Sequence, residues 1–421
     1  MNSMNDVINV SRSTLEGTVK LSGAKNSALR LLAASILTDQ PVELENFPES
    51  LLDIQVHLEM LQALGKNTEV SDDHVHISEP SGKLSSVLRW EKRSIRNTLL
   101  ILGALTTRFS EGKVPLPGGC KLGERKYDIH VHLLEALGAK VWEEGDYLCA
   151  ESTGRLRGAD IHLPIRSTGA TENAILCASL AEGTSTIWNP HIRPEIIDLI
   201  EMLRSMGANI SVFGQERIEV VGVEALKGTK HTVIADNMEA ITWAIASVIT
   251  GGNIEILNFP FDHLEVPLVY LRESGMRYYR GKDSLIVRGG VPYPVEISTG
   301  PYPGINSDMQ PLFAVYGLCS KGTSKIVDLR FPGRYGYMNE LQKMGAKHAV
   351  KGDLLEIDGG INLSGAVVKA LDLRAGMALL LAGMVAEGST TVTSAWQIER
   401  GYNKLDQKLR SIGAQFERSN S

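Results

Sequence analysis

One cysteine of the sequence stands in a setting that could make its thiol reactive. Cys120 lies in the run PGGCKLGERK (residues 117–126), where glycines punctuate the chain and Lys121, Arg125 and Lys126 lie within six residues of it. A glycine-rich loop can move as a lid over a site, and nearby cations lower the pKa of a thiol. We therefore predict a mobile lid that carries an activated cysteine. The alternative is an ordinary exposed cysteine in a flexible loop.

Three cations stand where segments of helical pattern begin, namely Lys25, Arg96 and Arg374. A positive charge there opposes the partial positive charge of the helix start, so capping does not explain it. A ring of helix starts facing a cleft would instead favour an anionic ligand. Taken alone, Asp308 fits a helix N-cap and Arg400 fits a solvated charge at a helix start. The other polar residues at such starts also fit simple capping; they are Asn26, Asn97, residues 167–172, Asp236, Asn237, residues 306–308 and Asp372.

Neither the histidines nor the other cysteines form a pattern typical of a metal site. His130 and His132 stand two apart in DIHVH, but no third ligand has suitable spacing, so we expect no metal. The four cysteines lie far apart without a CxxC pair, which argues against a zinc ribbon and against a disulfide framework, and so favours a reducing compartment. We expect Cys149, Cys177 and Cys319 to be small core residues.

The elements that must position these side chains form a repeat. Helix-like segments such as LEMLQALGK, HLLEALGAK and IEMLRSMGAN recur along the chain and end in a glycine every 68 to 73 residues. A second helix-like segment, closed by a turn and followed by strand-like residues, lies half a repeat earlier each time. The sequence therefore predicts six units of about 70 residues of alternating helix and strand. The closing glycines are Gly65, Gly138, Gly207, Gly275, Gly345 and Gly413.

The composition agrees with six such units. Glycine (41 of 421 residues) is enriched because each unit needs tight helix-to-strand turns, and aromatic residues are only 6% because segments rich in small residues let helices pack closely. Six units exceed one core, so we expect two pseudo-symmetric α/β domains of three units each. A solenoid of six units is the alternative. Against it, equivalent positions carry different charged residues, as expected for one site collected from several units.

Charge and hydropathy exclude several classes of protein. With 43% hydrophobic and 22% charged residues the chain is typical of a soluble globular protein, and its net charge of −6 includes no basic block of the kind that binds nucleic acid. The N-terminus lacks the pattern of a signal peptide, and the longest apolar run, residues 375–386, is too short to span a membrane. We expect a cytoplasmic protein without a membrane partner.

Several long motifs closely resemble those of UDP-N-acetylglucosamine enolpyruvyl transferases. They are LSGAKNSALRLLAASIL, PLPGGCKLGER, STGATENAILCASLAEGTS, PYPGINSDMQP, and LDLRAGMALLLAGMVAEGSTTV followed by QIERGYNKLDQKLRSIGA. The resemblance covers essentially the whole chain in the family's order. The sister family, 5-enolpyruvylshikimate-3-phosphate synthase, shares the sixfold architecture but carries a different lysine motif and lacks the PGGC loop.

The resemblance implies a fold and a reaction. The fold would be a two-domain inside-out α/β barrel of six βαβαββ repeats, with residues 23–232 as one domain and residues 1–22 plus 233–421 as the other. The reaction would transfer the enolpyruvyl group of phosphoenolpyruvate to the 3-hydroxyl of UDP-N-acetylglucosamine with release of phosphate, the first committed step of peptidoglycan synthesis. No cofactor and no metal are implied. The substrates would be the only partners of a monomer or weak oligomer.

The resemblance also assigns residues. Lys25, Arg125, Arg374 and Arg400 would hold phosphoenolpyruvate, Cys120 would donate a proton or add covalently, and Asp308 would accept the hydroxyl proton. Arginines suit the phosphate and carboxylate of this substrate because their forks bind such groups bidentately. The nucleotide sugar would contact Asn26, Arg96, Arg125, Lys126, Tyr127, Asp128, Ile129, Ser167, Thr168, Gly169, Asp308, Arg330 and Phe331, and Arg334 and Asp372 would complete the active site.

The chain departs from the family pattern mostly on the nucleotide side. The departures are Arg30, Lys126, Tyr127, Thr168, Arg193, Asn237, Gly333 and Tyr337. They are compatible with a diverged peptidoglycan enzyme, with a paralogue that transfers enolpyruvyl to another nucleotide or nucleoside hydroxyl, or with a non-catalytic nucleotide-sugar-binding paralogue. The family's set of reactive residues argues against the last of these. The sequence leaves open the acceptor, the oligomeric state, feedback control, and whether Cys120 forms an adduct or only transfers a proton.

Overall fold

The computed structural model describes residues 6–80, 84–117 and 127–420, and its chain divides into two compact units. Unit 1 joins the N-terminal segment up to Ser22 to the segment from Ala235 onwards, and unit 2 comprises Gly23–Ile234. Val233 and Ile234 belong to unit 2 because Val233 N donates to Glu45 O (2.9 Å) and Ile234 O accepts from Ala24 N (2.7 Å). The expected inside-out α/β architecture is confirmed in both units, because each consists of inner helices surrounded by three sheets.

Each unit holds three buried helices that pack against one another and three outer helices. In unit 2 the inner helices are α1 (Lys25–Ala34), α3 (Thr98–Phe109) and α5 (Thr168–Ser179), and the outer ones α2 (Leu52–Leu64), α4 (Asp128–Ala136) and α6 (Pro194–Ser205). In unit 1 the inner helices are α7 (Asn237–Thr250), α9 (Gln310–Cys319) and α11 (Leu373–Val385), and the outer ones α8 (Glu265–Glu273), α10 (Tyr337–Lys343) and α12 (Leu405–Ser411). Three short 3₁₀ segments are η2 (Ser35–Leu37), η3 (Phe261–His263) and η4 (Ala395–Arg400).

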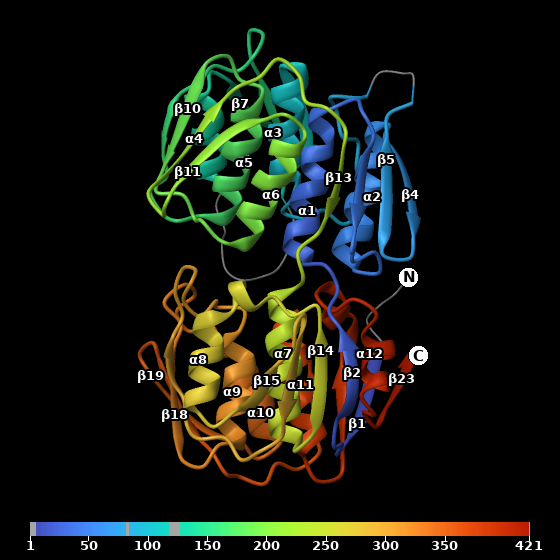
Figure 1. Ribbon diagram of the computed structural model, residues 1–421, viewed down its shortest axis with the longest axis vertical. Coiled ribbons are helices and arrows are strands. Elements are labelled where there is room, and N and C mark those ends of the chain that lie inside the picture. The colour runs from blue at the N-terminus through green and yellow to red at the C-terminus, as the bar shows by residue number, and fades with distance from the viewer. Residues whose placement is uncertain (1–5, 81–83, 118–126, 421) are drawn as a thin grey trace. The chain divides into compact units, whose positions relative to one another are not determined.

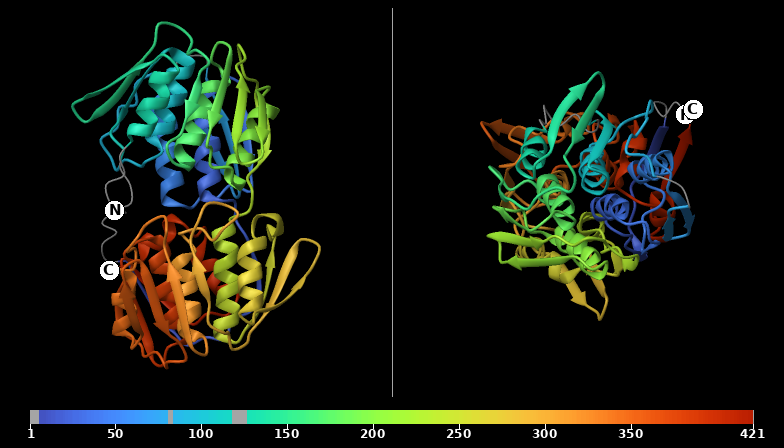
Figure 2. Two further views of the ribbon diagram at one scale, coloured as in Figure 1. Left: turned by 90° about the vertical axis from the view of Figure 1, so that its left-hand side faces the viewer. Right: turned by 90° about the horizontal axis from the view of Figure 1, so that it is seen from above.

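Sheets enclose these helices in both units, as Figures 1 and 2 show. In unit 2 the strand orders are β13-β3-β5-β4, β6-β8-β7 and β11-β12-β10-β9; in unit 1 they are β15-β16-β14-β2, β17-β18-β20-β19 and β21-β22-β1-β23. The strands of unit 2 are β3 (Val42–Glu45), β4 (Asn67–Ser71), β5 (His74–Ser78), β6 (Glu111–Pro115), β7 (Lys140–Glu144), β8 (Tyr147–Glu151), β9 (Asp160–His162), β10 (Thr184–Trp188), β11 (Asn209–Phe213), β12 (Arg217–Val221) and β13 (Thr229–Thr232). Those of unit 1 are β1 (Asp6–Ser11), β2 (Glu16–Lys20), β14 (Asn253–Leu257), β15 (Arg277–Arg280), β16 (Ser284–Arg288), β17 (Glu296–Ser298), β18 (Thr323–Val327), β19 (Lys347–Lys351), β20 (Leu354–Asp358), β21 (Val367–Lys369), β22 (Ser389–Thr393) and β23 (Phe416–Asn420).

The sheets repeat one pattern of pairing. In five of the six sheets of the described residues, a strand pairs in parallel with the strand that follows the inner helix, as β9 does with β10, and an antiparallel pair completes the sheet. In the sixth, only the bridge between Val87 and Lys113 stands where the parallel strand would lie. The six predicted βαβαββ units are therefore confirmed.

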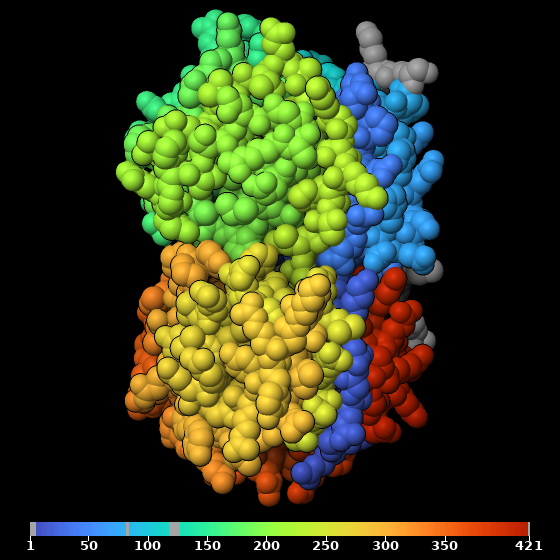
Figure 3. Space-filling view, in the orientation of Figure 1, coloured from blue at the N-terminus to red at the C-terminus, as the bar shows by residue number. Residues whose placement is uncertain are grey.

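The N-terminal strands close the repeats of unit 1. Strand β2 pairs in parallel with β14, and β1 pairs antiparallel with both β22 and β23. In Figure 3 the blue N-terminal segment of unit 1 accordingly runs beside yellow-green and red parts of the chain. The first strands of the sequence thus belong to the unit formed by the segment from Ala235 onwards, where they supply strands to two of the three sheets.

The inner helices are apolar all round, which is typical of helices buried on every side. In α11, for example, every residue from Leu373 to Met384 is buried. This helix contains most of the long apolar run seen in the sequence, so that run forms part of the core of unit 1. Among the described helices none combines the length and apolar character needed to cross a membrane.

The six glycines that define the repeat do what the pattern predicts. Gly65, Gly138, Gly207, Gly275, Gly345 and Gly413 all have φ between 74° and 110°. They follow the outer helices and turn the chain into the next strand in a left-handed conformation that other residues rarely adopt.

A further glycine shows why small residues are common in the inner helices. A Cβ atom on Gly103 of α3 would lie 2.0 Å from Asn173 Oδ1 and 2.9 Å from Cys177 Sγ, both on α5. The two helices therefore approach too closely for any side chain at this position. The low aromatic content follows from contacts of this kind.

Replacing Gly103 by Ala should destabilise unit 2. Overpacking costs about 2 kcal/mol here, which exceeds the gain of about 1 kcal/mol that Ala brings to a helix, and the midpoint of urea unfolding should fall. Gly290→Ala is the matched control, because no atom lies within 4 Å of its added Cβ. Equal midpoints for the two variants would contradict the close approach of α3 and α5.

Candidate functional site

In unit 1 the starts of α9 and α11 and the loop before α10 bring two aspartates and two arginines together. Asp308 precedes α9, and its Oδ1 accepts a hydrogen bond from Arg334 Nη1 (3.0 Å) while its Oδ2 lies 3.8 Å from Arg374 Nε. Arg334 Nη2 also lies 3.5 Å from Asp372 Oδ2. The side chain of Asp308 is 30% exposed, so its carboxylate is accessible.

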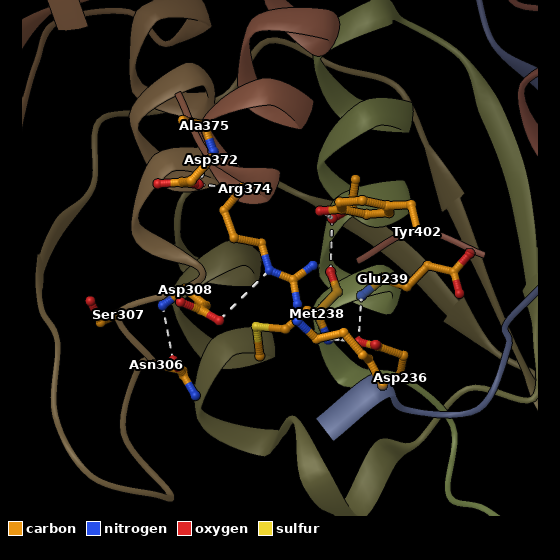
Figure 4. Close-up of polar contacts among 12 residues, drawn as sticks. Asp236, Met238, Glu239, Asn306, Ser307, Asp308, Asp372, Arg374, Ala375 and Tyr402 are labelled. Carbon is orange, nitrogen blue, oxygen red and sulfur yellow. Dashed lines mark hydrogen bonds and ion pairs between the residues drawn. The ribbon is translucent and has the colours of Figure 1, made fainter. Parts of the chain in front are cut away.

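Arg374 is the most buried cation of this cluster. Its side chain is 1% exposed, and neither Nε nor Nη1 has a hydrogen-bond partner. Figure 4 shows the guanidinium between Asp308 on one side and Tyr402 and Asp236 on the other, with the Tyr402 ring centroid 5.2 Å from Cζ. Although burial by itself lowers the pKa of Arg374, Tyr402, Asp308 and Asp236 together raise it above its ordinary value. A charged guanidinium with unused N–H donors is suited to bind an anion.

The backbone at Arg374 explains why an arginine is tolerated at a helix start. Asp372 caps α11 and accepts hydrogen bonds from the backbone N atoms of Arg374 (2.8 Å) and Ala375 (2.9 Å). Asp236 caps α7 in the same way, through Met238 N (2.8 Å) and Glu239 N (3.0 Å). These carboxylates offset the unfavourable charge at the helix start. Asp308 has no such function: Asn306 Oδ1 accepts its backbone N–H (2.9 Å), and the helix begins two residues later.

Arg400 is buried and lies at the end of η4. It is therefore not the solvated charge at a helix start that its local sequence would suggest. Its Nη1 donates to Gln397 Oε1 (3.0 Å). A Cβ on the next residue, Gly401, would lie 3.3 Å from Arg374 Nη1, so this segment runs directly against the Arg374 guanidinium.

The remaining predicted residues of unit 1 lie on the loop after β18. The backbone N atoms of Arg330 and Phe331 both donate to Asp328 Oδ1 (3.0 Å each), and Asp328 Oδ2 also accepts from Ser307 Oγ (2.5 Å). The Phe331 ring centroid lies 5.7 Å from Arg334 Cζ. The buried carboxylate of Asp328 thus holds this loop beside the residue before Asp308. We could not have predicted its role from the sequence, because it carries no motif.

In unit 2, Lys25 is the first residue of α1. Its Nζ lies 3.6 Å from Asp53 Oδ2 on α2, and Arg93 Nη2 lies 3.8 Å from Asp53 Oδ1. Neither Asp53 nor Arg93 is among the residues predicted from the sequence. Asn26 follows Lys25 in the first turn of the helix and is half-buried.

The predicted residue Gly169 lies against a buried histidine, and the predicted residue Arg96 stands two residues before α3. The ring of His130 lies against Gly169, whose added Cβ would be 3.4 Å from it, and His130 Nδ1 lies 3.2 Å from Asn173 Nδ2. Burial, helped by the positive charges of Arg96 and Arg30, lowers the pKa of His130 to about 3. The ring is therefore neutral at physiological pH. His130 is a buried, neutral packing residue beside Gly169, a position that the resemblance assigns to the acceptor.

Ser167 and Thr168 open α5. Ser167 Oγ accepts from Ala170 N (3.4 Å) as the N-cap, and Thr168 Oγ1 lies 2.8 Å from His191 Nδ1. Thr168 departs from the family's pattern, and its hydroxyl gives His191 a partner that an aliphatic side chain would not.

Two other departures, Arg30 and Arg193, form a buried charge network in unit 2. Arg30 Nε lies 2.7 Å from Oε2 of Glu172, whose side chain is fully buried, and Arg193 binds Glu195 through two contacts of 2.6 and 2.7 Å. Burial raises the pKa of Glu172, whereas Arg193 lowers that of Glu195 against the effect of its burial. Each added cation therefore has its own carboxylate, which is how the fold accommodates it.

The other departures are placed as follows. Tyr127 precedes α4 and donates a hydrogen bond to Glu143, which raises the pKa of Tyr127 to about 12. Tyr337 is buried and accepts from Gln310 Nε2 (2.7 Å), and Asn237 is the first residue of α7. Gly333 has a φ of 76° in the loop before α10.

Two predicted site residues follow Tyr127 in the sequence. Asp128 and Ile129 are the first two residues of α4. Cys120, Arg125 and Lys126 lie outside the described residues.

The other three cysteines differ in burial. Cys149 and Cys177 are buried, as predicted, but Cys319 is only half-buried. Burial raises the pKa of all three thiols, to about 12 for Cys177 and Cys319. None of them is therefore suited to act as a thiolate. Within the described ranges there is also no cluster of three or more side chains that could hold a metal ion.

Solved structures of the same fold are enolpyruvyl transferases. The crystal structure of the enolpyruvyl transferase NikO from Streptomyces tendae superposes with a TM-score of 0.89 at 24% identity, covering 99% of this chain and all of that one. EPSP synthase from Acinetobacter baumannii superposes with a TM-score of 0.75 at 18% identity, covering 98% of this chain. These likenesses define the class by its fold.

Sequence comparison then defines the family. The family described as EPSP synthase (3-phosphoshikimate 1-carboxyvinyltransferase) matches residues 10–409. The UDP-N-acetylglucosamine 1-carboxyvinyltransferase of Actinobacillus succinogenes is 40% identical over 410 residues, which are 97% of each chain. Enzyme 1 of that name from Caldanaerobacter subterraneus is 39% identical over 405 residues, 96% of this chain and 97% of its own. The chain therefore belongs to the enolpyruvyl (1-carboxyvinyl) transferase family.

The buried histidines of unit 2 predict acid sensitivity. Burial and Arg30 lower the pKa of His57 to about 3, as burial and nearby arginines do for His130. Between about pH 6.5 and pH 3 the unfolded chain takes up these protons and the folded chain does not, so stability falls with pH in this window. Each histidine costs about 2 kcal/mol at pH 5 relative to pH 7.

His130→Gln should therefore reduce the difference between the urea midpoints at pH 7 and pH 5, whatever its effect at pH 7. His57→Gln should do the same, and the double variant should reduce the difference further. A difference that stays as large as in the wild type would contradict the neutral state of these rings.

Proposed function

We propose that this protein transfers the enolpyruvyl group of phosphoenolpyruvate to the 3-hydroxyl of UDP-N-acetylglucosamine, releasing phosphate. The observation that carries the proposal is the buried Arg374 with unused N–H donors beside the accessible carboxylate of Asp308. The relatives that are about 40% identical over nearly the whole chain support the choice of acceptor. The reaction would be the first committed step of peptidoglycan synthesis, and we place it in the cytoplasm.

Phosphoenolpyruvate carries a phosphate and a carboxylate, about three negative charges near neutral pH, so its binding needs several fixed cations. Arg374 and Arg400 are buried in unit 1, and Lys25 is buried at the start of α1 in unit 2. We assign these three residues to the substrate, together with Arg125 from the loop. Arginine forks bind both phosphate and carboxylate oxygens bidentately, which favours this assignment.

Addition of a hydroxyl across the enol double bond needs a base for the hydroxyl proton and an acid for the methylene carbon. We assign the base to Asp308, because Arg334 orients one carboxylate oxygen and the side chain remains accessible. We assign the acid to Cys120. Two observations support that choice. Burial raises the pKa of the other three thiols, which makes them poor proton donors and nucleophiles. Cys120, in contrast, has basic residues close to it in the sequence. The tetrahedral intermediate then loses phosphate from C2 and a proton from the methyl carbon, which returns to the Cys120 thiolate, to give the enolpyruvyl ether.

We assign the remaining acceptor residues from the family resemblance. Within unit 2 they are Asn26, Arg96, Asp128, Ile129, Ser167, Thr168 and Gly169, with Tyr127 and Lys126 from the segment before α4. Arg330 and Phe331 contribute from the loop after β18 in unit 1, and Arg334 and Asp372 brace Asp308 and Arg374.

A second acceptor is favoured by one specific observation. The paired cations Arg30 and Arg193 and the Thr168–His191 contact change the surroundings of the acceptor-side residues. Such changes suit an enolpyruvyl transferase that acts on another nucleotide or nucleoside hydroxyl, so the test includes that class.

The purified protein should release phosphate from phosphoenolpyruvate when UDP-N-acetylglucosamine is added, and the product should gain the mass of one enolpyruvyl group. Phosphate release by a coupled assay and mass spectrometry of the nucleotide measure this. Uridine, UMP and UDP-glucose serve as alternative acceptors, and Asp358→Asn, which changes an exposed carboxylate on β20, is the control for substitution. Release with UMP or uridine but not with UDP-N-acetylglucosamine would overturn the proposal in favour of the second acceptor.

A further inference from the structure

The chain passes between the units at two places, and the backbone is tightly held at both. It enters unit 2 at Ser22–Gly23 and leaves it at Ile234–Ala235. Within unit 2, Ala24 N donates to Ile234 O (2.7 Å), so the two segments are bonded to each other there. A Cβ on Gly23 would lie 1.9 Å from Asn46 O, which leaves no room for a side chain.

A buried carboxylate of unit 2 contacts both of these segments. Asp198 of α6 is only 4% exposed, and its Oδ2 accepts a hydrogen bond from Ser27 Oγ in the first turn of α1. His231 Nε2 of β13 lies 2.7 Å from Asp198 Oδ1, and the backbone N of Ile234 lies 3.5 Å from Oδ2. One side chain thus joins the start of α1, strand β13 and the segment that leaves the unit.

The first turn of α1 needs such a contact. Its N-cap, Ala24, has no side chain that could accept a hydrogen bond, and the turn contains no acidic residue. It begins with a lysine, whose charge opposes the helix dipole. Asp53 lies 3.6 Å from the Lys25 ammonium, and Asp198, from a neighbouring helix, adds a second carboxylate at Ser27, two residues after Lys25.

In unit 1 a buried carboxylate likewise holds Ser22, the last residue before the chain enters unit 2. Glu239 of α7, also buried, accepts a hydrogen bond from Ser22 N (3.0 Å) and pairs with Lys408, whose Nζ donates to Ser22 Oγ (2.7 Å). One buried carboxylate in each unit therefore fixes a crossing segment. Its recurrence in both units argues that the contact at Asp198 is more than ordinary packing.

We propose that Asp198 is a positioning residue for Lys25 and Asn26. By tying Ser27 to β13 and to Ile234, it fixes the backbone of the first turn of α1, from which the Lys25 side chain extends towards Asp53. The role rests on the proposed function, which assigns Lys25 to phosphoenolpyruvate. Asp198 itself does not act on the substrate.

Kinetics of Asp198→Asn and Ser27→Ala test the proposal. Each variant should lower kcat/KM for phosphoenolpyruvate at least tenfold, chiefly through KM, and the double variant should be no worse than Asp198→Asn, because both remove one interaction. Asp6→Asn is the matched control, since Asp6 is equally buried and paired with Arg418 in a sheet of unit 1. It should lower the Tm without changing kcat/KM. Additive losses, or losses equal to that of Asp6→Asn, would overturn the proposal.

Amide hydrogen exchange provides an arm that needs no substrate. In Asp198→Asn, exchange in peptides covering residues 24–31 should be at least tenfold faster than in the wild type, with peptides of α11 unchanged. Unchanged exchange at residues 24–31, or equally faster exchange throughout unit 2, would overturn the positioning role. A wild type that transfers no enolpyruvyl group would instead overturn the proposed function, and the exchange result would still decide whether Asp198 holds the turn.

Discussion

The candidate site of unit 1 depends on one buried charge, the guanidinium of Arg374. Removing an arginine from water is costly unless its charge and its N–H groups are matched. Asp308, Asp236 and the Tyr402 ring match the charge, but Nε and Nη1 keep unused donors. The fold therefore holds a cation whose hydrogen-bonding capacity is incomplete without an anion. The ordering of Asp308 by Arg334 and the capping of α11 by Asp372 both follow from the need to hold this group in place.

The six repeats make that arrangement possible. Three inner helices in each unit start close together, so polar residues that are far apart in the sequence meet at one end of a helical core. In unit 1 these are Asp236, Asp308 and Arg374; in unit 2, Gly169 lies against the ring of His130. Every cation placed there needs a carboxylate nearby, as the pairs of Arg30 with Glu172 and of Arg193 with Glu195 show. Two departures from the family's pattern, Arg30 and Arg193, are thus accommodated by pairing with a carboxylate.

Much of this could be predicted from the sequence, because its signals are local. The glycine period fixes the repeat, since a left-handed turn after each outer helix requires glycine, and cations at helix starts indicate an anion site. Partners that carry no motif could not be predicted. Asp53, Asp328 and Asp198 look like ordinary acidic residues, and only the fold brings them to Lys25, Ser307 and Ser27. The exposure of Cys319 and the burial of Arg400 likewise depend on packing between segments.

The central claim is that the unused donors of Arg374 bind phosphoenolpyruvate. Isothermal titration of the wild type and of Arg374→Lys with phosphoenolpyruvate, in the presence of UDP-N-acetylglucosamine, tests it most directly. Lysine keeps the positive charge but lacks the planar fork. The account predicts an affinity about 10- to 100-fold lower in the variant, with a Tm close to that of the wild type. Equal affinities for phosphoenolpyruvate would contradict it.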